Sequence, residues 1–253
     1  MFKKLLVGMG IGAAKVDFEI HQHRVEVGGI ISGTVRICGG SIDQQVDEAY
    51  IKLVVTSSFA YEEQVRSIKQ EIGAIKVADK LLVRANSPEI IIPVRFKLPY
   101  NIPISSGRTK YYFETGLDVK NAIDPKDVDV IIITPNVYMQ MIFDALYSLG
   151  FRDKPMSGDY NGRCQKFEYR PTRFMARKLD ELEVYLTAEE DRINVLMEID
   201  KKTRGYFGKI ADELDLNERH VGFSIPYHNM QNVDRVAVML KNVIEDEYKK
   251  IHY

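Results

Sequence analysis

Residues 24–40 read Arg-Val-Glu-Val-Gly-Gly-Ile-Ile-Ser-Gly-Thr-Val-Arg-Ile-Cys-Gly-Gly, and their alternation decides the fold class. Apolar side chains fall on odd positions and polar ones on even positions, as in a strand with one buried face. Glycine pairs at 28–29 and 39–40 interrupt the alternation, where a turn or bulge requires a positive φ. The stretch therefore predicts a half-buried β-ribbon of a binding or structural protein. Its buried face is expected to contain Val25, Val27, Ile31, Val35 and Ile37.

The same alternation continues outward from this ribbon as far as residue 134. Residues 51–55, 90–98 and 111–119 each repeat it, and the apolar run 128–133 is expected to be buried on both faces. Pro93 donates no ladder hydrogen bond, so its strand is expected to be an edge or to bulge there. About seven short strands without an intervening helix predict a β-sandwich over residues 1–134.

The pattern changes at Thr134-Pro135, which resembles a helix start. Threonine as N-cap, proline at the first helical position and Gly150 after the last turn predict a connector helix over residues 135–150. Strand patterns resume over residues 151–231, including a hairpin whose turn is expected at residues 188–191. This region is predicted to be a second β-sandwich, so the chain is expected to be mainly β with two tandem sandwich domains.

Residues 232–253 are predicted to form a C-terminal amphipathic helix. Asn232 is the expected N-cap, and apolar residues recur at helical spacing. The apolar stripe requires a cover, which is either this protein's own sandwich or another subunit or partner. On the second alternative, the candidate interaction residues of the helix are Leu240, Ile244 and Tyr248.

Composition excludes several functional classes. The 35 basic and 36 acidic residues leave a net charge of -1, so no overall field attracts the chain to nucleic acid or to an anionic membrane. Two cysteines are too few for a disulfide framework or a four-cysteine zinc site, which favours reduced thiols in a cytoplasmic protein. No stretch approaches the roughly 18 apolar residues of a membrane span. The glycines at 8, 10 and 12 do not follow a strand, so no nucleotide cofactor is expected.

Three clusters are candidates for binding or catalysis. His21 and His23 have the spacing of metal ligands on a strand, but an exposed strand end explains them better, and no metal is expected. The carboxylates at 189–191 fit a solvated hairpin tip better than a catalytic pair. A basic cluster with neighbouring aromatic rings fits either a phosphorylated or nucleic-acid partner or a solvated loop. Its candidate interaction residues are Lys201, Lys202, Arg204, Tyr206 and Phe207.

Several blocks of the sequence resemble the bacterial SpoOM-type sporulation-control family. They are residues 10–17, the Val-Gly-Gly and Ser-Gly-Thr-Val segments of the ribbon, and residues 38–45. Residues 96–99 and 103–105 are similar to a segment shared with arrestin-like proteins, and residues 197–205 resemble a later strand and loop of the family. The resemblance implies two arrestin-like sandwiches in an intracellular regulator, and it implies no catalytic residues.

We therefore expect a non-enzymatic cytoplasmic regulator or adaptor of sporulation or stress response. It would present strand edges to partner proteins, using backbone pairing for affinity and side chains for specificity. A homo-oligomer is compatible with this expectation. The alternative function is a β-sandwich module for a small ligand such as a carbohydrate, although the chain contains no tryptophan to form a stacking platform. A soluble enzyme is the third alternative.

Overall fold

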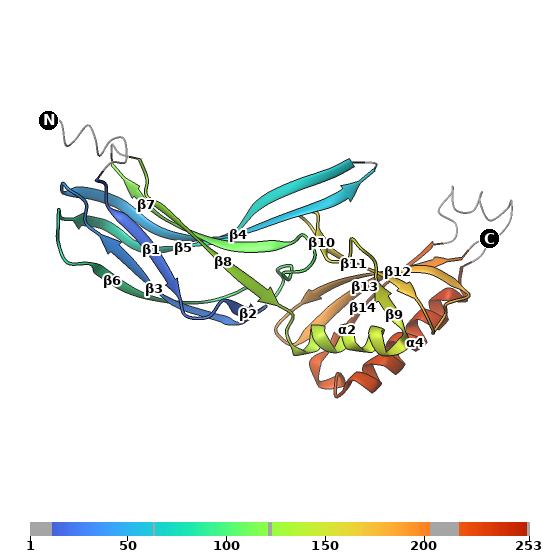
Figure 1. The fold of residues 1–253 in the computed structure, drawn as a ribbon. Coiled ribbons are helices and arrows are strands. Elements are labelled where there is room, and N and C mark those ends of the chain that lie inside the picture. The colour runs from blue at the N-terminus through green and yellow to red at the C-terminus, as the bar shows by residue number, and fades with distance from the viewer. Residues whose placement is uncertain (1–11, 63, 121–122, 203–217, 252–253) are drawn as a thin grey trace.

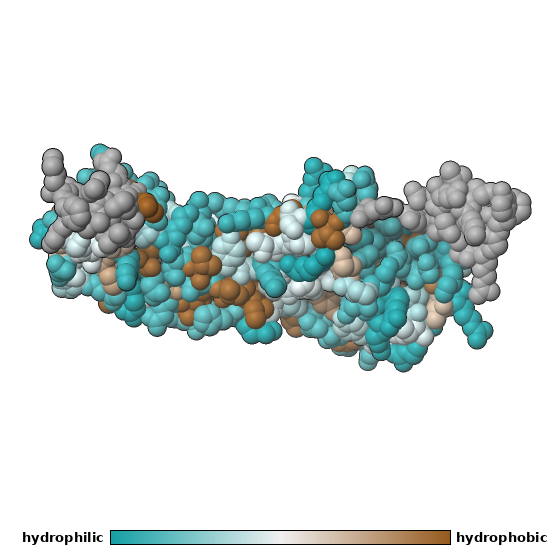
Figure 2. Space-filling view, turned by 45° about the horizontal axis from the view of Figure 1, so that its top comes forward, coloured by the Kyte–Doolittle hydropathy of each residue, from teal (hydrophilic) through white to brown (hydrophobic). Residues whose placement is uncertain are grey.

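The computed structural model describes residues 12–62, 64–120, 123–202 and 218–251, which form an elongated, mainly β molecule (Figure 1). The face shown in Figure 2 is mostly hydrophilic, with separate hydrophobic patches. Strands dominate both halves, and the described part of the second half contains two α-helices. Neither helix is long and apolar enough to cross a membrane, within the residues that the structure describes.

Two sheets pack face to face in the first half. The three-stranded sheet has the order β1-β3-β6, and the five-stranded sheet has the order β2-β8-β7-β4-β5. Phe113 of the larger sheet makes edge-to-face contacts with Phe18 and Phe96 of the smaller one, at ring-centroid distances of 5.6 and 5.7 Å. The first half is thus the expected sandwich. Its strands are β1 (Lys15–Ile20), β2 (Arg24–Glu26), β3 (Ile30–Cys38), β4 (Gln44–Tyr61), β5 (Gln64–Val83), β6 (Ile90–Lys97), β7 (Lys110–Val119) and β8 (Lys126–Thr134).

The opening stretch folds as its alternation predicts. All five apolar residues of its odd positions are buried. Gly28 has the expected positive φ, of 73°. Gly39 and Gly40 have a different role, because a Cβ at either position would collide with the backbone of Arg84 or Gly12.

Two predictions for the first half were wrong in detail. The strands are not all short, because residues 44–83 form one hairpin of β4, with 18 residues, and β5, with 20, which extends beyond the sheet toward the second half (Figure 1). The run 128–133 is not buried on both faces, because Val128 and Val130 are 57% and 68% exposed. Their side of β8 is the outer face of the sheet, and β2 pairs with β8 only from Ile132 onward.

Strands of the second half form one six-stranded sheet instead of two facing sheets. Its order is β10-β11-β12-β13-β14, and β9 pairs with β11. The two helices pack together and against this sheet (Figure 1). The predicted second sandwich is therefore replaced by a sheet covered by helices. The elements are α2 (Val137–Leu149), β9 (Phe151–Asp153), β10 (Asp159–Tyr160), β11 (Gln165–Pro171), β12 (Leu179–Ala188), β13 (Arg192–Lys201), β14 (Glu218–Pro226), the 3-10 turn η1 (Tyr227–Asn229) and α4 (Val233–Tyr248).

Both helices have well-defined ends. The N-cap of α2 is Asn136, whose side chain accepts a hydrogen bond from the Met139 amide at 2.9 Å, and not Thr134, which ends β8. Gly150 closes α2 in the left-handed conformation with φ 93°, as expected. Asn232 caps α4 as predicted, because its side chain accepts from the Arg235 amide at 2.9 Å.

Hydrogen bonds join the two halves. The Gln165 side chain exchanges two bonds of 2.8 Å with the backbone of Ile104. The Arg108 Nε lies 3.2 Å from Oδ2 of the buried Asp159, and the Tyr160 amide donates to Ser57 at 3.1 Å. Polar groups of the two halves thus satisfy one another's hydrogen bonds in a partly buried layer. These bonds set the position of β10 beside β4.

Candidate protein-interaction site

The two lateral sides of the first-half sandwich have different structures. One side lies between β1 and β8. The other side lies between β5 and β6, each of which is the outermost strand of its sheet. Pro93 lies in β6 and pairs with Thr34 in a regular register, so the strand is an edge, as predicted, and does not bulge. We call the β5–β6 side the open side and the β1–β8 side the closed side.

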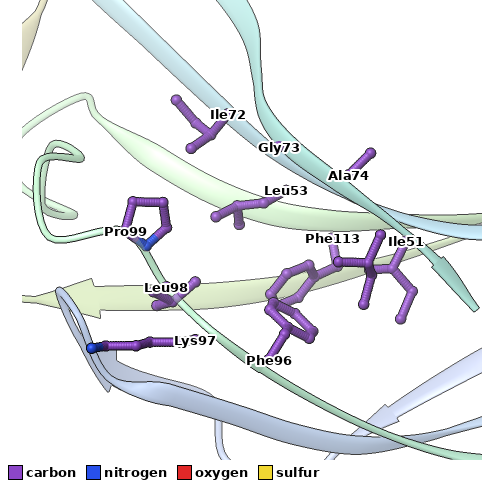
Figure 3. Close-up of a pocket in the computed structure, with 11 residues that line it drawn as sticks. Ile51, Leu53, Ile72, Gly73, Ala74, Phe96, Lys97, Leu98, Pro99 and Phe113 are labelled. Carbon is purple, nitrogen blue, oxygen red and sulfur yellow. The ribbon is translucent and has the colours of Figure 1, made fainter.

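The open side contains an apolar groove of about 200 Å³ (Figure 3). Phe113 and Leu98 form buried parts of its lining, and Ile51 and Leu53 contribute from β4. The groove is lined by Ile51, Leu53, Ile72, Gly73, Ala74, Ile75, Phe96, Lys97, Leu98, Pro99 and Phe113.

Residues that should form the sandwich core on this side are only half-buried. In β6 they are Ile90, Ile92, Val94 and Phe96, which alternate with exposed residues. In β5 the half-buried apolar residues pack against the core in the same incomplete way, and they include Ile72 and Ile75. An inward strand face that stays half-exposed leaves apolar surface for another element to cover.

Gly73 marks the middle of the exposed β5 edge. It pairs with Leu53 directly beside a β-bulge, and a Cβ built on it would meet nothing within 4 Å. Neither crowding nor a positive φ therefore requires glycine there. Glycine within a strand often marks close approach of a ligand or another backbone.

A single charged side chain lines the groove. Lys97 lies at one end, with its Nζ 4.7 Å from the centre of the Tyr100 ring and 3.8 Å from the Glu190 carboxylate. The ion pair contributes little, because Glu190 is 82% exposed. The lining otherwise supplies apolar contact and strand edges.

The closed side is sealed by carboxylates. Asp127 of β8 points toward β1, where its Oδ2 accepts the Phe18 amide at 3.1 Å. Asp129 points the same way, and its Oδ2 is buried without a hydrogen-bond partner in the structure. Burial and the neighbouring Asp127 raise the pKa of Asp129 from its ordinary value of 3.8 to about 7.

Among the predicted interaction residues that the structure describes, Lys201 and Tyr248 lie together, whereas Leu240 and Ile244 are buried. Lys201 ends β13, with its Nζ 5.2 Å from the ring centre of Tyr248, and Lys202 is exposed beside it. Leu240 and Ile244 are fully buried on the inner face of α4, so this chain covers them itself. Three further candidates lie outside the described residues, namely Arg204, Tyr206 and Phe207.

The other predicted clusters do not line the groove, although Glu190 of the carboxylate cluster pairs with its lining residue Lys97. His21 is exposed after β1, 3.4 Å from the Thr34 hydroxyl, and the backbone carbonyl of His23 accepts from Ile132. Glu189 to Asp191 form the exposed tip between β12 and β13.

The exposed cysteine Cys38 is not activated as a nucleophile. Its thiol donates a hydrogen bond to Glu89 at 3.2 Å, and this bond raises the thiol pKa, which disfavours the nucleophilic thiolate.

One carboxylate cluster was missed by the sequence analysis. Glu168, Glu181 and Glu183 bring three oxygens within 4.8 Å of one another on β11 and β12. Lys166 lies 3.0 Å from Glu168 and 2.7 Å from Glu183, and Lys154 pairs with Glu181. These two lysines offset most of the charge of the three carboxylates, which form an ion-pair network.

The groove was also missed, although two signals pointed to it. Pro93 marks β6 as an edge, and the Gly73-Ala74 pair weakens the strand pattern of β5. Two edges that face each other across a core were not deducible from these signals, because sheet order depends on contacts distant in sequence. Chemically, the site offers unpaired backbone groups and apolar surface, which suit an added peptide strand.

Comparison with known proteins gives a consistent result. A family model described as "SpoOM protein" matches residues 2–203. The sporulation-control protein spo0M of Bacillus subtilis (strain 168) is 27% identical over 255 aligned residues, covering 98% of each chain. The crystal structure of Spo0M from Bacillus subtilis superposes with a TM-score of 0.80 at 23% identity, covering 94% of this chain and all of that one.

Proposed function

This chain belongs to the SpoOM protein family, and on that premise we propose that it regulates sporulation or a related stress response by binding other proteins. The proposal includes no catalytic step. It places the protein in the cytoplasm, where Cys38 and Cys164 remain free thiols. A relative named for sporulation control supports the regulatory role.

The observation that carries the proposal is the open side of the first half. An extended segment of a partner would pair with an exposed strand edge and place alternate side chains over the groove. Backbone hydrogen bonds would supply affinity, and the apolar lining near Gly73 would select the side chains. Covering the half-buried residues of β5 and β6 would add hydrophobic stabilisation.

The groove favours this function over binding of a carbohydrate. Small-molecule sites usually have volumes of about 300–1,000 Å³ and a few convergent polar groups. The groove measures about 200 Å³, and Lys97 is its only charged lining residue. A sugar would leave its hydroxyls without partners on such a surface.

Affinity capture from the native host with matched variants tests the proposal. Gly73→Glu places a carboxylate over the groove, where the added Cβ meets open space. Val65→Glu is the control, because Val65 lies on the same strand, is 64% exposed and does not line the groove. Proteins captured by the wild type and by Val65→Glu should be lost with Gly73→Glu. Identical captured sets would contradict binding at the groove.

A further inference from the structure

A second groove lies between the edge strand β14 and α4. Its volume is about 590 Å³. Among the described strands, β14 is the outermost one of its sheet, beyond β13. The groove is lined by Val221, Phe223, Asn229, Arg235, Val238, Met239, Asn242, Val243, Asp246, Glu247 and Lys250.

The walls of this groove are held in place within the chain. The Arg219 Nε of β14 donates to Glu247 of α4 at 3.0 Å, and Glu247 is only 9% exposed. Hydrogen bonds from Lys250 and Arg219 lower the pKa of Glu247, so its carboxylate is ionised at neutral pH. The spacing between helix and strand is therefore fixed before any ligand arrives.

Apolar side chains of the groove are incompletely covered. Val238 is 58% exposed, although Val236 and Leu240 on the opposite side of the helix are fully buried. Val221 and Phe223 of β14 are only half-buried. Gly222 lies between them, and a Cβ there would meet only Leu196, at an ordinary 3.9 Å. The chain itself does not require this glycine, whereas close approach of another backbone would.

The outward face of α4 is complementary to itself in the reversed direction. An antiparallel copy related by a two-fold axis between Leu240 and Lys241 would place Arg235 opposite Asp246 and Val238 opposite Val243. Met239 would then lie opposite Asn242. All these residues line the groove. Opposite charges thus meet at both ends, and between them the valines meet each other while Met239 meets Asn242. Each contact occurs twice, as an isologous interface requires.

We propose that this surface binds a second copy of the chain. β14 pairs antiparallel with β14 of the second copy, and α4 packs on its counterpart over the joined sheet. The two contacts are geometrically compatible, because α4 contacts both β13 and β14. Two strand spacings then separate the helices by about 9.6 Å, within the usual interaxial distance of about 8–10 Å.

Sedimentation equilibrium of the full chain over a concentration series tests the proposal. We expect reversible association to twice the monomer mass of 29.0 kDa. Val238→Glu should weaken the dimer by at least about tenfold, because it places two like charges in an apolar contact. At concentrations where the wild type is monomeric, the two chains should melt at the same temperature. Lys241→Glu is the control, since Lys241 is exposed on α4 but does not line the groove.

Charge reversal distinguishes this arrangement from other occupants. Arg235→Asp and Asp246→Arg should each weaken the dimer, because like charges then face each other across the axis. The double variant should restore the dimer, because it again places opposite charges at these positions. A wild-type chain that stays monomeric at every concentration would overturn the proposal. A dimer that is insensitive to Val238→Glu would do the same, as it would show that copies associate through another surface and leave this groove to a different partner.

Discussion

The closed and open sides of the first-half sandwich differ in what lies between their outermost strands. On the closed side, β8 lies next to the outermost strand β2, and its inward carboxylate Asp127 accepts a backbone hydrogen bond from β1. On the open side, apolar residues of β5 and β6 face a groove and stay half-buried. The strands on both sides have the same period of two, so alternation alone does not reveal whether an edge is sealed. The identity of the inward residues reveals it, because a carboxylate ends a core whereas an apolar residue extends it.

The largest expected effect is the loss of the core that the two sides share. Phe113 is fully buried and contacts both Phe18 and Phe96. Phe113→Ala should lower the free energy of unfolding by about 3–5 kcal/mol, because it leaves a cavity between the sheets. Urea denaturation measures this change. A loss below that of Phe96→Ala would mean that the groove, and not the space between the sheets, is the main core.

The closed side should respond to pH. Because the folded-state pKa of Asp129, about 7, exceeds its ordinary value of 3.8, the folded state retains this proton over that range. Its contribution to stability is therefore complete below pH 3.8 and is lost as pH rises through 7. After allowance for solvent screening, Asp129→Asn should stabilise the protein by about 1–2 kcal/mol above neutrality.

Thermal melts of this variant and the wild type at pH 5 and pH 8 test the prediction. The difference in stability should be smaller at pH 5, where the carboxyl of the folded wild type is still protonated. An equal gain at both values would assign the effect to something other than titration of Asp129. The open side contains no group with this behaviour in its lining, so Phe96→Ala is expected to shift stability equally at both pH values.

Truncation at the rim of the open side should cost less than truncation of the shared core. Phe96 is only half-buried, so Phe96→Ala is expected to cost about 1–2 kcal/mol. The exposed neighbour Arg95 provides the matched control, and Arg95→Ala should stay within about 0.5 kcal/mol. Denaturant melts compare the two. Equal losses would mean that the inward and outward faces of β6 are exchanged.

The smallest effect is expected at Gly73. Gly73→Ala should stabilise the free protein by about 0.4–1 kcal/mol, because alanine restricts the unfolded chain and its Cβ meets no atom. Gly28→Ala should do the opposite, since Gly28 has a φ of 73° and a Cβ there would collide with Tyr100. A destabilised Gly73→Ala variant would show that the space over this glycine is already filled.

Local signals in the sequence predicted local structure well. The alternation of residues 24–40, the edge position of Pro93, the Asn232 cap and the Gly150 helix end are all confirmed. Each of these depends on neighbours within a few residues, where backbone sterics and hydrogen bonding decide the outcome.

Features that depend on distant contacts were not predicted. Alternating strands of the second half show that one sheet face is buried, but they do not identify its cover, which is helical. The stripe of α4 likewise predicts burial of Leu240 and Ile244 without identifying what covers them. The groove was missed for the same reason, because it forms only where β5 and β6 meet the core.

β4 is one continuous strand, and its middle and its end serve different parts of the molecule. Ile51 and Leu53 line the groove, whereas Ser57 accepts a hydrogen bond from Tyr160 of the second half. In mechanical terms, β4 resembles a beam held at the groove and at the junction. The bulge between these two points lies in β5, where Ile72 is the extra residue opposite the step from Leu53 to Val54. A strand added at the groove would change the twist of this beam, and the second half is attached to its other end.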